Sequence, residues 1–562
     1  MDKTQLIIQK NIEKGRTGLK RLEEASKNGF EENRKLLLKI IEENKNTQYG
    51  KKYGFEYIKT IEDYIKKVPV TEYKDYEEYI AGIERGEKNV LSARETIHFA
   101  LSSGSSGTPK KVPMCQEAAD LFAMYTHGAC FAAMDRELGD NWKKGRGVSL
   151  TEIRFSTGQN GFTYGAVSGK VREKNKAYES DIYTSPLSVS YPECDMDFMY
   201  LHLRFALVEK NLSFITCTFM TAVYDTMRYL ETNWQTLVND IERGTISDSI
   251  NMPASVRNEL LEAISPAPER ARFIEREFKK GFEGIMPRIW PDLAFVFGIG
   301  SESFRIYTDR LRFFLGGVRV HYSVFSASEG IFACPIKSES DEMVLIPFSA
   351  FYEFRDINSE SAGTVTMDKV QKGRRYELIV TNLSGFYRYR MMDVVEVVDF
   401  YNGLPVIKFL YRLNQVLNIA GEKTNDSTMK LVIKNFEKKT GIRFKEYTLY
   451  ADTNSSPGRY IVFAEYENEI SAFQAEGISV IIEECLCEMN GSYAAKIRAG
   501  KLKPLVFVPL KKGAYADYIE MMKKKGVSVN QLKPVRVADS HEKAEFFIKR
   551  TTEHGRGLIL KA

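Results

Sequence analysis

The chain has 562 residues, 43% hydrophobic and 28% charged, which is typical of a globular protein of about two to four domains and excludes a disordered one. The formal charge of +5, from 80 basic and 75 acidic residues, is too small an excess to indicate nucleic-acid or membrane binding. Seven scattered cysteines, a polar N-terminus and the lack of a long apolar run predict a cytoplasmic protein in a reducing compartment.

The N-terminal quarter predicts helices followed by one strand. Residues 3–44 carry apolar side chains at helical spacing. Two short acidic and aromatic segments, 61–65 and 73–83, are expected to pack over a sheet. The apolar run 97–101 predicts a strand of that sheet.

That strand leads directly into Ser102-Ser-Gly-Ser-Ser-Gly-Thr-Pro-Lys110. Glycines allow successive N–H groups to turn toward an anion, hydroxyls donate to phosphate oxygens, and the lysine offsets the phosphate charge. A flexible linker is the alternative, but a linker seldom follows a buried strand or ends in Pro-Lys-Lys. The spacing excludes a GxxxxGK(S/T) P-loop. We therefore predict a phosphate-binding loop of a different kind.

The middle of the chain predicts alternating helices and strands. Strand 293–299, helix 304–315 and strand 318–324 form a strand–helix–strand unit, which indicates a largely parallel sheet. Ligands of such sheets collect beyond the carboxyl ends of the strands, where Ser326-Ala-Ser-Glu-Gly330 follows. Earlier segments predict a helix at 118–134, a loop near a site or an exposed turn at 158–169, a helix at 201–208, a strand at 214–219 and a helix ending near residue 240.

The C-terminal part predicts two further units. From residue 343 short strands indicate a small barrel or antiparallel layer, and after a polar connection a separate α+β unit follows. We therefore predict an α/β protein with an N-terminal domain at 1–411, a hinge at 412–424 and a small mobile domain at 425–562. The expected strands of the last unit are 444–450, 460–466 and 505–509, and its expected helices are 471–489 and 513–524.

The sequence resembles a known family in several ordered motifs. The loop at Ser102 resembles the Ser/Thr-Ser-Gly-Ser/Thr-Ser/Thr-Gly-x-Pro-Lys signature of adenylate-forming enzymes. Asn46-Thr-Gln-Tyr-Gly, Lys67-Val-Pro-Val-Thr-Glu-Tyr73, Leu230-Glu-Thr-Asn-Trp234 and Gln531-Leu-Lys-Pro-Val-Arg536 resemble the auxin-responsive promoter family of acyl acid–amido synthetases, which occurs in plants and bacteria. The resemblance spans roughly residues 30–545.

The resemblance implies a two-step ligase that uses ATP and Mg²⁺. A carboxylic acid is first converted to an acyl-adenylate, and an amine, expected to be an amino acid, then displaces AMP. The resemblance assigns the β- and γ-phosphates to Ser102, Ser103, Ser105, Ser106 and Lys110. It assigns the α-phosphate or adenine to Ser326 and Ser328, and Mg²⁺ to Glu329, which could otherwise be a plain surface acid.

The same resemblance implies ribose and transfer roles nearer the C-terminus. Asp393, in Tyr387-Arg-Tyr-Arg-Met-Met-Asp393, would accept hydrogen bonds from both ribose hydroxyls, although alone it could simply begin a strand. Arg412 would contact ribose or phosphate. Lys533 would be catalytic and neutralise charge at the α-phosphate or the acyl carboxylate. Glu422 and Lys423 are further candidates for the closed site.

Three departures from the family pattern stand out. Ser105 replaces a threonine, Met392 replaces the glycine before the ribose aspartate, and the aromatic of the Tyr-Gly-Ser-Ser-Glu motif corresponds to Phe325 or Ser326. The acyl pocket is expected between residues 120 and 230. Its candidates, each equally suited to a plain core position, are Phe162, Tyr164, Phe219, Met220, Val223 and Tyr224.

Two rival functions stay open on sequence grounds. An acyl-CoA ligase would share the adenylation step but pass the acyl group to a thiol. A nucleotide-binding protein without turnover would keep the ATP site alone, although the joint presence of Lys110, Glu329, Asp393, Arg412 and Lys533 disfavours it. The sequence indicates neither the acid, nor the amine, nor the oligomeric state.

Overall fold

The computed structural model describes most of the chain and divides it into two compact units. The described residues are 2–102, 110–194, 196–300, 305–357, 363–413, 417, 419, 422, 424, 426–453, 457–466, 472–498, 502–525, 532, 534–538, 540–553 and 555–556. The larger unit comprises Met1–Ser102, Lys110–Met391 and Val395–Phe409, and the smaller is built mainly from Leu410–Ala562 with Met392–Val394.

The first sheet carries the two ends of the predicted phosphate loop. Its strand order is β2-β1-β5-β4. β1 runs antiparallel to β2, with Ser102 opposite Lys110, and parallel to β5. The predicted strand at 97–101 is thus confirmed. The bounds are β1 (Thr96–Ser102), β2 (Lys110–Cys115), β4 (Phe155–Thr157) and β5 (Thr163–Gly165).

The prediction of a loop throughout 158–169 is wrong in part. β5 and the beginning of α8 (Val167–Glu173) lie inside it. The Tyr164 ring stacks on Phe99 with centroids 5.3 Å apart, and its backbone pairs with β1. A three-residue strand held by such distant contacts leaves no periodic pattern in the sequence.

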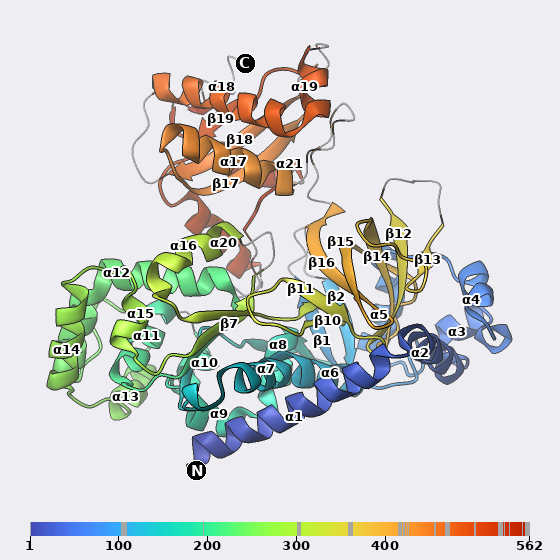
Figure 1. Ribbon diagram of the computed structural model, residues 1–562, viewed down its shortest axis with the longest axis horizontal. Coiled ribbons are helices and arrows are strands. Elements are labelled where there is room, and N and C mark those ends of the chain that lie inside the picture. Colours follow the sequence, from blue (N-terminus) through green and yellow to red (C-terminus); the bar gives the residue numbers. More distant parts are fainter. Residues whose placement is uncertain are drawn as a thin grey trace. The chain divides into compact units, whose positions relative to one another are not determined.

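The second sheet is parallel, as predicted. Its order is β3-β6-β7-β8, and each neighbouring pair runs parallel. The long helix α12 packs on α11, α14 and α16 beside this sheet (Figure 1). The bounds are β3 (Gly147–Ser149), β6 (Phe214–Phe219), β7 (Phe295–Ile299), β8 (Arg319–Tyr322), α11 (Phe198–Val208), α12 (Met220–Arg243), α14 (Pro268–Phe278) and α16 (Arg305–Leu315).

The antiparallel layer predicted after residue 343 is a sheet of eight described strands. Their order is β13-β12-β14-β15-β16-β11-β10-β9, and antiparallel pairing joins β9 to β10, β10 to β11, β11 to β16, and β12 to both β13 and β14. It begins earlier than predicted, at Phe325. The bounds are β9 (Phe325–Ala327), β10 (Gly330–Pro335), β11 (Glu342–Leu345), β12 (Ala350–Asp356), β13 (Val365–Thr366), β14 (Arg375–Asn382), β15 (Tyr389–Tyr401) and β16 (Leu404–Arg412).

The long N-terminal helix packs closely on the larger unit. α1 lies along α7 and the π-helical turn η3 (Figure 1). A Cβ at Gly15 would lie 1.8 Å from the carbonyl oxygen of Gly128, so glycine is required for this approach. The helix predicted at 118–134 is interrupted by this turn. The bounds are α1 (Lys3–Ser26), α2 (Gly29–Asn44), α6 (Gln116–Ala123), η3 (Met124–Gly128) and α7 (Ala129–Leu138).

The smaller unit is α+β, as predicted. β17 pairs antiparallel with β18, which pairs parallel with β19. Helices α17 and α18 pack against each other (Figure 1). The bounds are β17 (Phe444–Asp452), β18 (Arg459–Tyr466), β19 (Val506–Pro509), α17 (Asp426–Thr440), α18 (Ala472–Met489), α19 (Gly491–Arg498), α20 (Ala514–Lys524) and α21 (His541–Ile548).

Shorter helices complete the larger unit. They are α3 (Gln48–Lys52), η1 (Phe55–Tyr57), α4 (Ile61–Lys67), η2 (Tyr73–Asp75), α5 (Glu77–Glu84), η4 (Gly139–Asn141), α9 (Lys176–Ile182), α10 (Leu187–Ser190), α13 (Ala254–Glu262) and α15 (Ile285–Ile289). No helix in the described part of the chain has both the length and the apolar character that a bilayer crossing needs.

Candidate active site

The two lysines that follow the predicted phosphate loop have different surroundings. The Lys110 ammonium lies 5.3 Å from the centroid of the Tyr73 ring, a cation–π distance. The Lys111 ammonium is 2.7 and 3.0 Å from the two Glu84 carboxylate oxygens, and Glu84 also accepts a 2.7 Å hydrogen bond from Tyr164. Lys111 is therefore held in a network of side chains, whereas Lys110 rests on an aromatic face.

The Tyr73 side chain contacts the residues at the end of the phosphate loop. Its phenol oxygen accepts a 2.8 Å hydrogen bond from the backbone N–H of Lys111. Burial raises the pKa of the Tyr73 phenol, and the nearby negative charges of Glu77, Glu84 and Glu329 raise it further. Tyr73 therefore contacts both residues that follow the loop, because its ring carries the Lys110 ammonium and its oxygen binds the Lys111 backbone.

Glu329 occupies a hairpin turn. Ser328 and Glu329 connect β9 to β10, with Ala327 opposite Gly330 and Ser326 opposite Ile331. All three predicted site residues of this segment are partly exposed. Within the described part of the chain, the Glu329 carboxylate has no hydrogen-bond or ion-pair partner, whereas its backbone oxygen accepts a 2.7 Å hydrogen bond from Asn382.

The aromatic side chain beside this turn belongs to the sheet. The Phe325 ring packs 5.7 Å from both the Phe332 and the Phe409 rings. Ser326 forms the backbone pair with Ile331 described above. The structure thus provides an aromatic ring next to the serine motif, at Phe325, and stabilises it by packing with its neighbours.

In the smaller unit, Asp393 and Arg412 form a bidentate ion pair. The Arg412 Nε and Nη2 atoms lie 2.7 and 3.0 Å from the two Asp393 oxygens. The Asp393 side chain is 3% exposed and that of Arg412 is 38% exposed. Because each carboxylate oxygen has a second lone pair, this pairing orients Asp393 and still leaves it acceptor capacity.

Met392, directly before Asp393, has a backbone conformation that favours glycine. Its φ is +58°, in the left-handed region that side chains with a Cβ rarely adopt. The family pattern has glycine at this position. The departure noted in the sequence is therefore a strained residue in the strand that presents Asp393.

Arg388, which lies in the same motif as Asp393, has a structural role. Arg388 donates to both Glu353 oxygens, and both side chains are buried. Its Nη1 atom also donates to the backbone oxygens of Ile65 and Val68 at the end of α4. These contacts use the guanidinium to join α4 to the eight-stranded sheet.

Several predicted site residues lie outside the described part. They are Ser103, Ser105, Ser106, Lys423 and Lys533, and of Ser102 only the backbone is described. Close to Lys533, the backbone oxygen of Arg536 accepts a 2.8 Å bond from Leu449, and Ala538 donates a 2.7 Å bond back to Leu449. Residues 536–538 are thereby attached along β17.

The Glu422 side chain stabilises the smaller unit through hydrogen bonds in its interior. Its Oε1 atom accepts hydrogen bonds of 2.7 Å from the Ile419 N–H and 2.6 Å from the Tyr460 hydroxyl. The side chain is buried. Its carboxylate thus holds the connecting segment against β18.

Four of the six acyl-pocket candidates separate into two groups beside the parallel sheet, whereas Phe162 and Tyr164 pack with another core cluster. Met220 and Val223 are fully buried in the helical core beside the parallel sheet, as ordinary core residues are. Phe219 instead clusters with the partly exposed Tyr224 and Ile299. Phe219 and Ile299 end β6 and β7, at the carboxyl edge where such sheets bind ligands.

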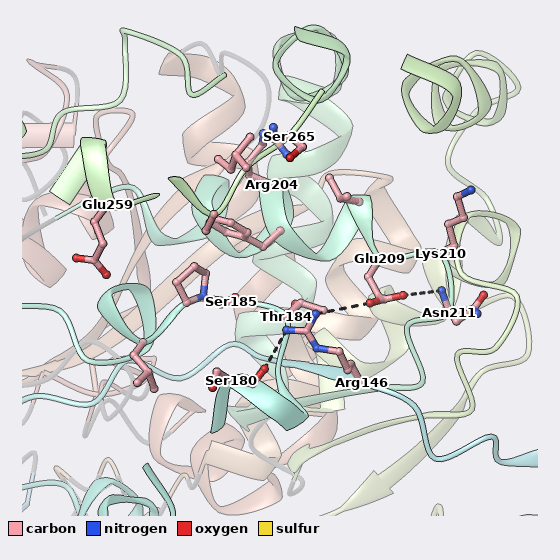
Figure 2. A pocket seen from close by; sticks show the side chains of 16 residues that line it. Arg146, Ser180, Thr184, Ser185, Arg204, Glu209, Lys210, Asn211, Glu259 and Ser265 are labelled. Atoms are coloured by element: carbon pink, nitrogen blue, oxygen red, sulfur yellow. Dashed lines mark hydrogen bonds and ion pairs between the residues drawn. The ribbon is translucent and has the colours of Figure 1, made fainter. Parts of the chain in front are cut away.

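A cavity of about 760 Å³ lies at the opposite, amino edge of the same sheet. Arg146 and Asn211, which precede β3 and β6, line it (Figure 2). The Arg146 Nη2 atom donates to the backbone oxygens of Ser180 and Tyr183, and Arg204 donates to two backbone carbonyls. The guanidinium groups of Arg146 and Arg204 therefore bind backbone oxygens of the protein itself. The cavity also lies at the edge opposite to the carboxyl edge, where parallel sheets bind their ligands.

Two residues with evident roles at the site were not singled out from the sequence. Tyr73 is the last residue of the motif at Lys67–Tyr73, but the sequence predicted no function for it. Asn382 gave no signal, because its contact with Glu329 joins residues 53 positions apart.

Comparisons with known proteins identify the family. The chain matches three domains of the GH3 family in order. The GH3 family N-terminal domain matches residues 18–320, the central domain residues 343–412 and the C-terminal domain residues 427–542. The putative indole-3-acetic acid-amido synthetase GH3.9 of Arabidopsis thaliana is 30% identical over 558 residues, covering 93% of this chain and 94% of the relative. The indole-3-acetic acid-amido synthetase GH3.6 of Arabidopsis thaliana is 28% identical, covering 93% and 91%.

Solved structures agree at the level of the fold. The GH3.15 acyl acid amido synthetase superposes with a TM-score of 0.83 at 24% identity, covering 96% of each chain. The same enzyme in complex with 2,4-DB gives a TM-score of 0.80, covering 95% of this chain and 96% of the other. The mixed α/β architecture predicted from the sequence is thereby confirmed, and the chain belongs to the GH3 family.

Proposed function

We infer that this protein is an acyl acid–amido synthetase, a ligase that forms an amide through an acyl-adenylate. A carboxylate oxygen attacks the α-phosphorus of ATP, the bond to the bridging oxygen breaks, and pyrophosphate leaves. An amine nitrogen then attacks the acyl carbon, AMP leaves, and the amine loses a proton. The observation that carries this inference is the match of all three GH3 domains, in order, across most of the chain.

The described residues fit a nucleotide where β1 ends and β2 begins. Adenylation brings a carboxylate toward a polyanion, so it needs cations and oriented donors where charge develops. Lys110 supplies a cation that is not committed to a carboxylate among the described residues. We propose that it acts with Ser102, Ser103, Ser105 and Ser106 on the β- and γ-phosphates.

Glu329 fits a magnesium ion carried by the nucleotide. Mg²⁺ in such sites takes one or two carboxylates together with phosphate oxygens. Glu329 is partly exposed, and its carboxylate has no hydrogen-bond or ion-pair partner among the described residues. We propose that it is this ligand, that Ser326 and Ser328 face the α-phosphate or adenine, and that Mg²⁺ would offset phosphate charge when bound.

The remaining roles concern ribose and acyl transfer. We propose that Asp393, oriented by Arg412, accepts hydrogen bonds from the ribose hydroxyls. Arg412 would contact ribose or phosphate, and Lys533 would neutralise charge at the α-phosphate. We also propose that residues 425–562 rotate about a hinge at 412–424 between the two half-reactions.

The substrates are proposed as classes. Relatives named for indole-3-acetic acid and a GH3.15 structure with 2,4-DB support a small carboxylic acid as the first substrate, and an amino acid is proposed as the amine. All seven cysteines are free thiols, which supports a reducing, cytoplasmic setting.

Product analysis tests this function against the thiol alternative. The purified protein is incubated with ATP, Mg²⁺, a panel of carboxylic acids, and either an amino-acid pool or coenzyme A, and products are identified by mass spectrometry. An amide with AMP and pyrophosphate is expected. Formation of acyl-CoA thioesters alone would make the protein an acyl-CoA ligase.

A further inference from the structure

Asn382 ends β14 and is the described side chain that holds the turn carrying Glu329. Its Nδ2 atom donates a 2.7 Å hydrogen bond to the backbone oxygen of Glu329. The residue is 3% exposed. A buried hydrogen bond at the end of a central strand restricts the position of the turn it contacts.

The orientation of this amide is determined by its other contacts. The Asn382 Oδ1 atom accepts hydrogen bonds from the backbone N–H groups of Ser384, at 3.0 Å, and Phe386, at 2.9 Å. Because both of these groups are donors, the oxygen must face them and the NH₂ group must face Glu329. The side chain therefore has no alternative flipped state with equal hydrogen bonding.

The turn on which Asn382 depends is itself fixed by the core. Gly385 has a φ of +107°, and a Cβ there would lie 2.6 Å from the Leu91 Cβ. The Tyr387 hydroxyl donates a 2.6 Å hydrogen bond to the Leu91 backbone oxygen. Ser384 accepts a 3.2 Å hydrogen bond from the N–H of Cys115, the last residue of β2.

These contacts join both ends of the proposed nucleotide site. β2 begins at Lys110 and ends at Cys115, which contacts the turn after β14, and Asn382 in that turn holds Glu329. We propose that Asn382 is a positioning residue for Glu329, so that the carboxylate is placed to share Mg²⁺ with the nucleotide phosphates. The proposal rests on the metal role proposed for Glu329.

Calorimetric binding of ATP tests the proposal without any acid substrate. The dissociation constant of ATP is measured with and without Mg²⁺ for the full-length protein and for variants. Mg²⁺ should tighten ATP binding to the unaltered protein. Asn382→Ala should reduce this enhancement by about 10–100-fold, the usual effect of losing a residue that orients a metal ligand.

Two further variants separate positioning from general stability. Asn382→Asp keeps the acceptors for Ser384 and Phe386 but removes the donor to Glu329, so it should lose the enhancement even if Asn382→Ala does not fold. Asn33→Ala is the matched control. Asn33 is 1% exposed and also makes three hydrogen bonds, to Pro347, Ala350 and Tyr352, so it should lose stability but keep the enhancement.

A double variant shows whether Asn382 acts through Glu329. Glu329→Gln alone should lose the Mg²⁺ enhancement, and adding Asn382→Ala should reduce it no further. Normal enhancement in Asn382→Ala and Asn382→Asp, with loss in Glu329→Gln, would overturn the proposal and leave the metal role intact. Normal enhancement in Glu329→Gln would overturn both, and no ATP binding to the unaltered protein would contradict the proposed function itself.

Discussion

Lys110 and Lys111 are adjacent cations, and their contacts predict different effects on adenylation. Lys110→Ala should lower the rate of acid-dependent pyrophosphate exchange by about 100-fold or more, because it removes a cation from the site where charge develops. Lys111→Ala is the control, since the Lys111 ammonium is bound to Glu84. It should change the exchange rate by only a few-fold. Equal losses in both variants would contradict the assignment of Lys110.

Met392 predicts an unusual gain in stability from a glycine substitution. Its φ of +58° costs a residue with a Cβ about 1 kcal/mol, so Met392→Gly should raise the free energy of unfolding by about that amount. Chemical denaturation followed by circular dichroism measures the change. Met391→Gly, at a buried neighbour whose φ is not positive, should lower it. A lower free energy of unfolding in Met392→Gly would show that the contacts of the Met392 side chain contribute more stability than the backbone strain costs.

The charged motifs of the proposed site were recognised in the sequence and stay predictions, whereas the contacts around them were not foreseen. Lys110 and Glu329 belong to short ordered patterns, and the structure places the Lys110 ammonium 5.3 Å from the centroid of the Tyr73 ring. The importance of Tyr73 and Asn382 depends on contacts between distant segments, which no local spacing reveals. Asp393 was recognised, but its bidentate partner Arg412 was assigned only to the nucleotide.

Secondary structure was also predictable where a local sequence pattern produces it, and was missed where contacts between distant segments produce it. The strand predicted at 214–219 is β6, because an apolar β-branched and aromatic run is a local signal. β5 was missed because three residues become a strand only through pairing with β1. The helix at 118–134 is interrupted at η3, where two glycine backbones meet, a constraint set by α1 more than a hundred residues earlier.

Strand β8 gives the fold a predicted sensitivity to acid. Burial lowers the pKa of His321 to about 4 from 6.5, despite the opposing charge of Glu137 and with a small contribution from Arg136. As the pH falls, His321 therefore becomes protonated in the unfolded chain before it does in the folded protein. The stability that neutral His321 contributes is complete above pH 6.5 and is lost as the pH falls toward 4. Between pH 7.5 and 5.5 the loss is about 1 kcal/mol.

Replacing His321 should flatten this part of the stability profile. His321→Leu should lose about 1 kcal/mol less than the unaltered protein between pH 7.5 and 5.5, as measured by urea denaturation at the two pH values. His541→Leu, at a side chain that is 67% exposed, is the control and should keep the original pH dependence. An unchanged profile in His321→Leu would show that the histidine does not titrate on unfolding in this range.

The whole chain combines a larger unit that presents Lys110 and Glu329 with a smaller unit that contains Arg412 and the segment around Asp393. The smaller unit has the three-stranded sheet β17-β18-β19, and the three GH3 domain matches extend through both units. The β- and γ-phosphates leave as pyrophosphate in the first half-reaction, so the groups proposed to bind them act in that step. We therefore expect changes at Lys110 or Glu329 to affect acyl-adenylate formation before any effect on amide formation appears.

Exchange of labelled pyrophosphate into ATP is the most direct test, because it reports adenylation alone and needs no amine. With the purified full-length protein, Mg²⁺ and a panel of carboxylic acids, we expect exchange that depends on at least one acid and is largely lost in Lys110→Ala. Folded protein that binds ATP but shows no acid-dependent exchange with any member of a broad panel would contradict the proposed adenylation chemistry.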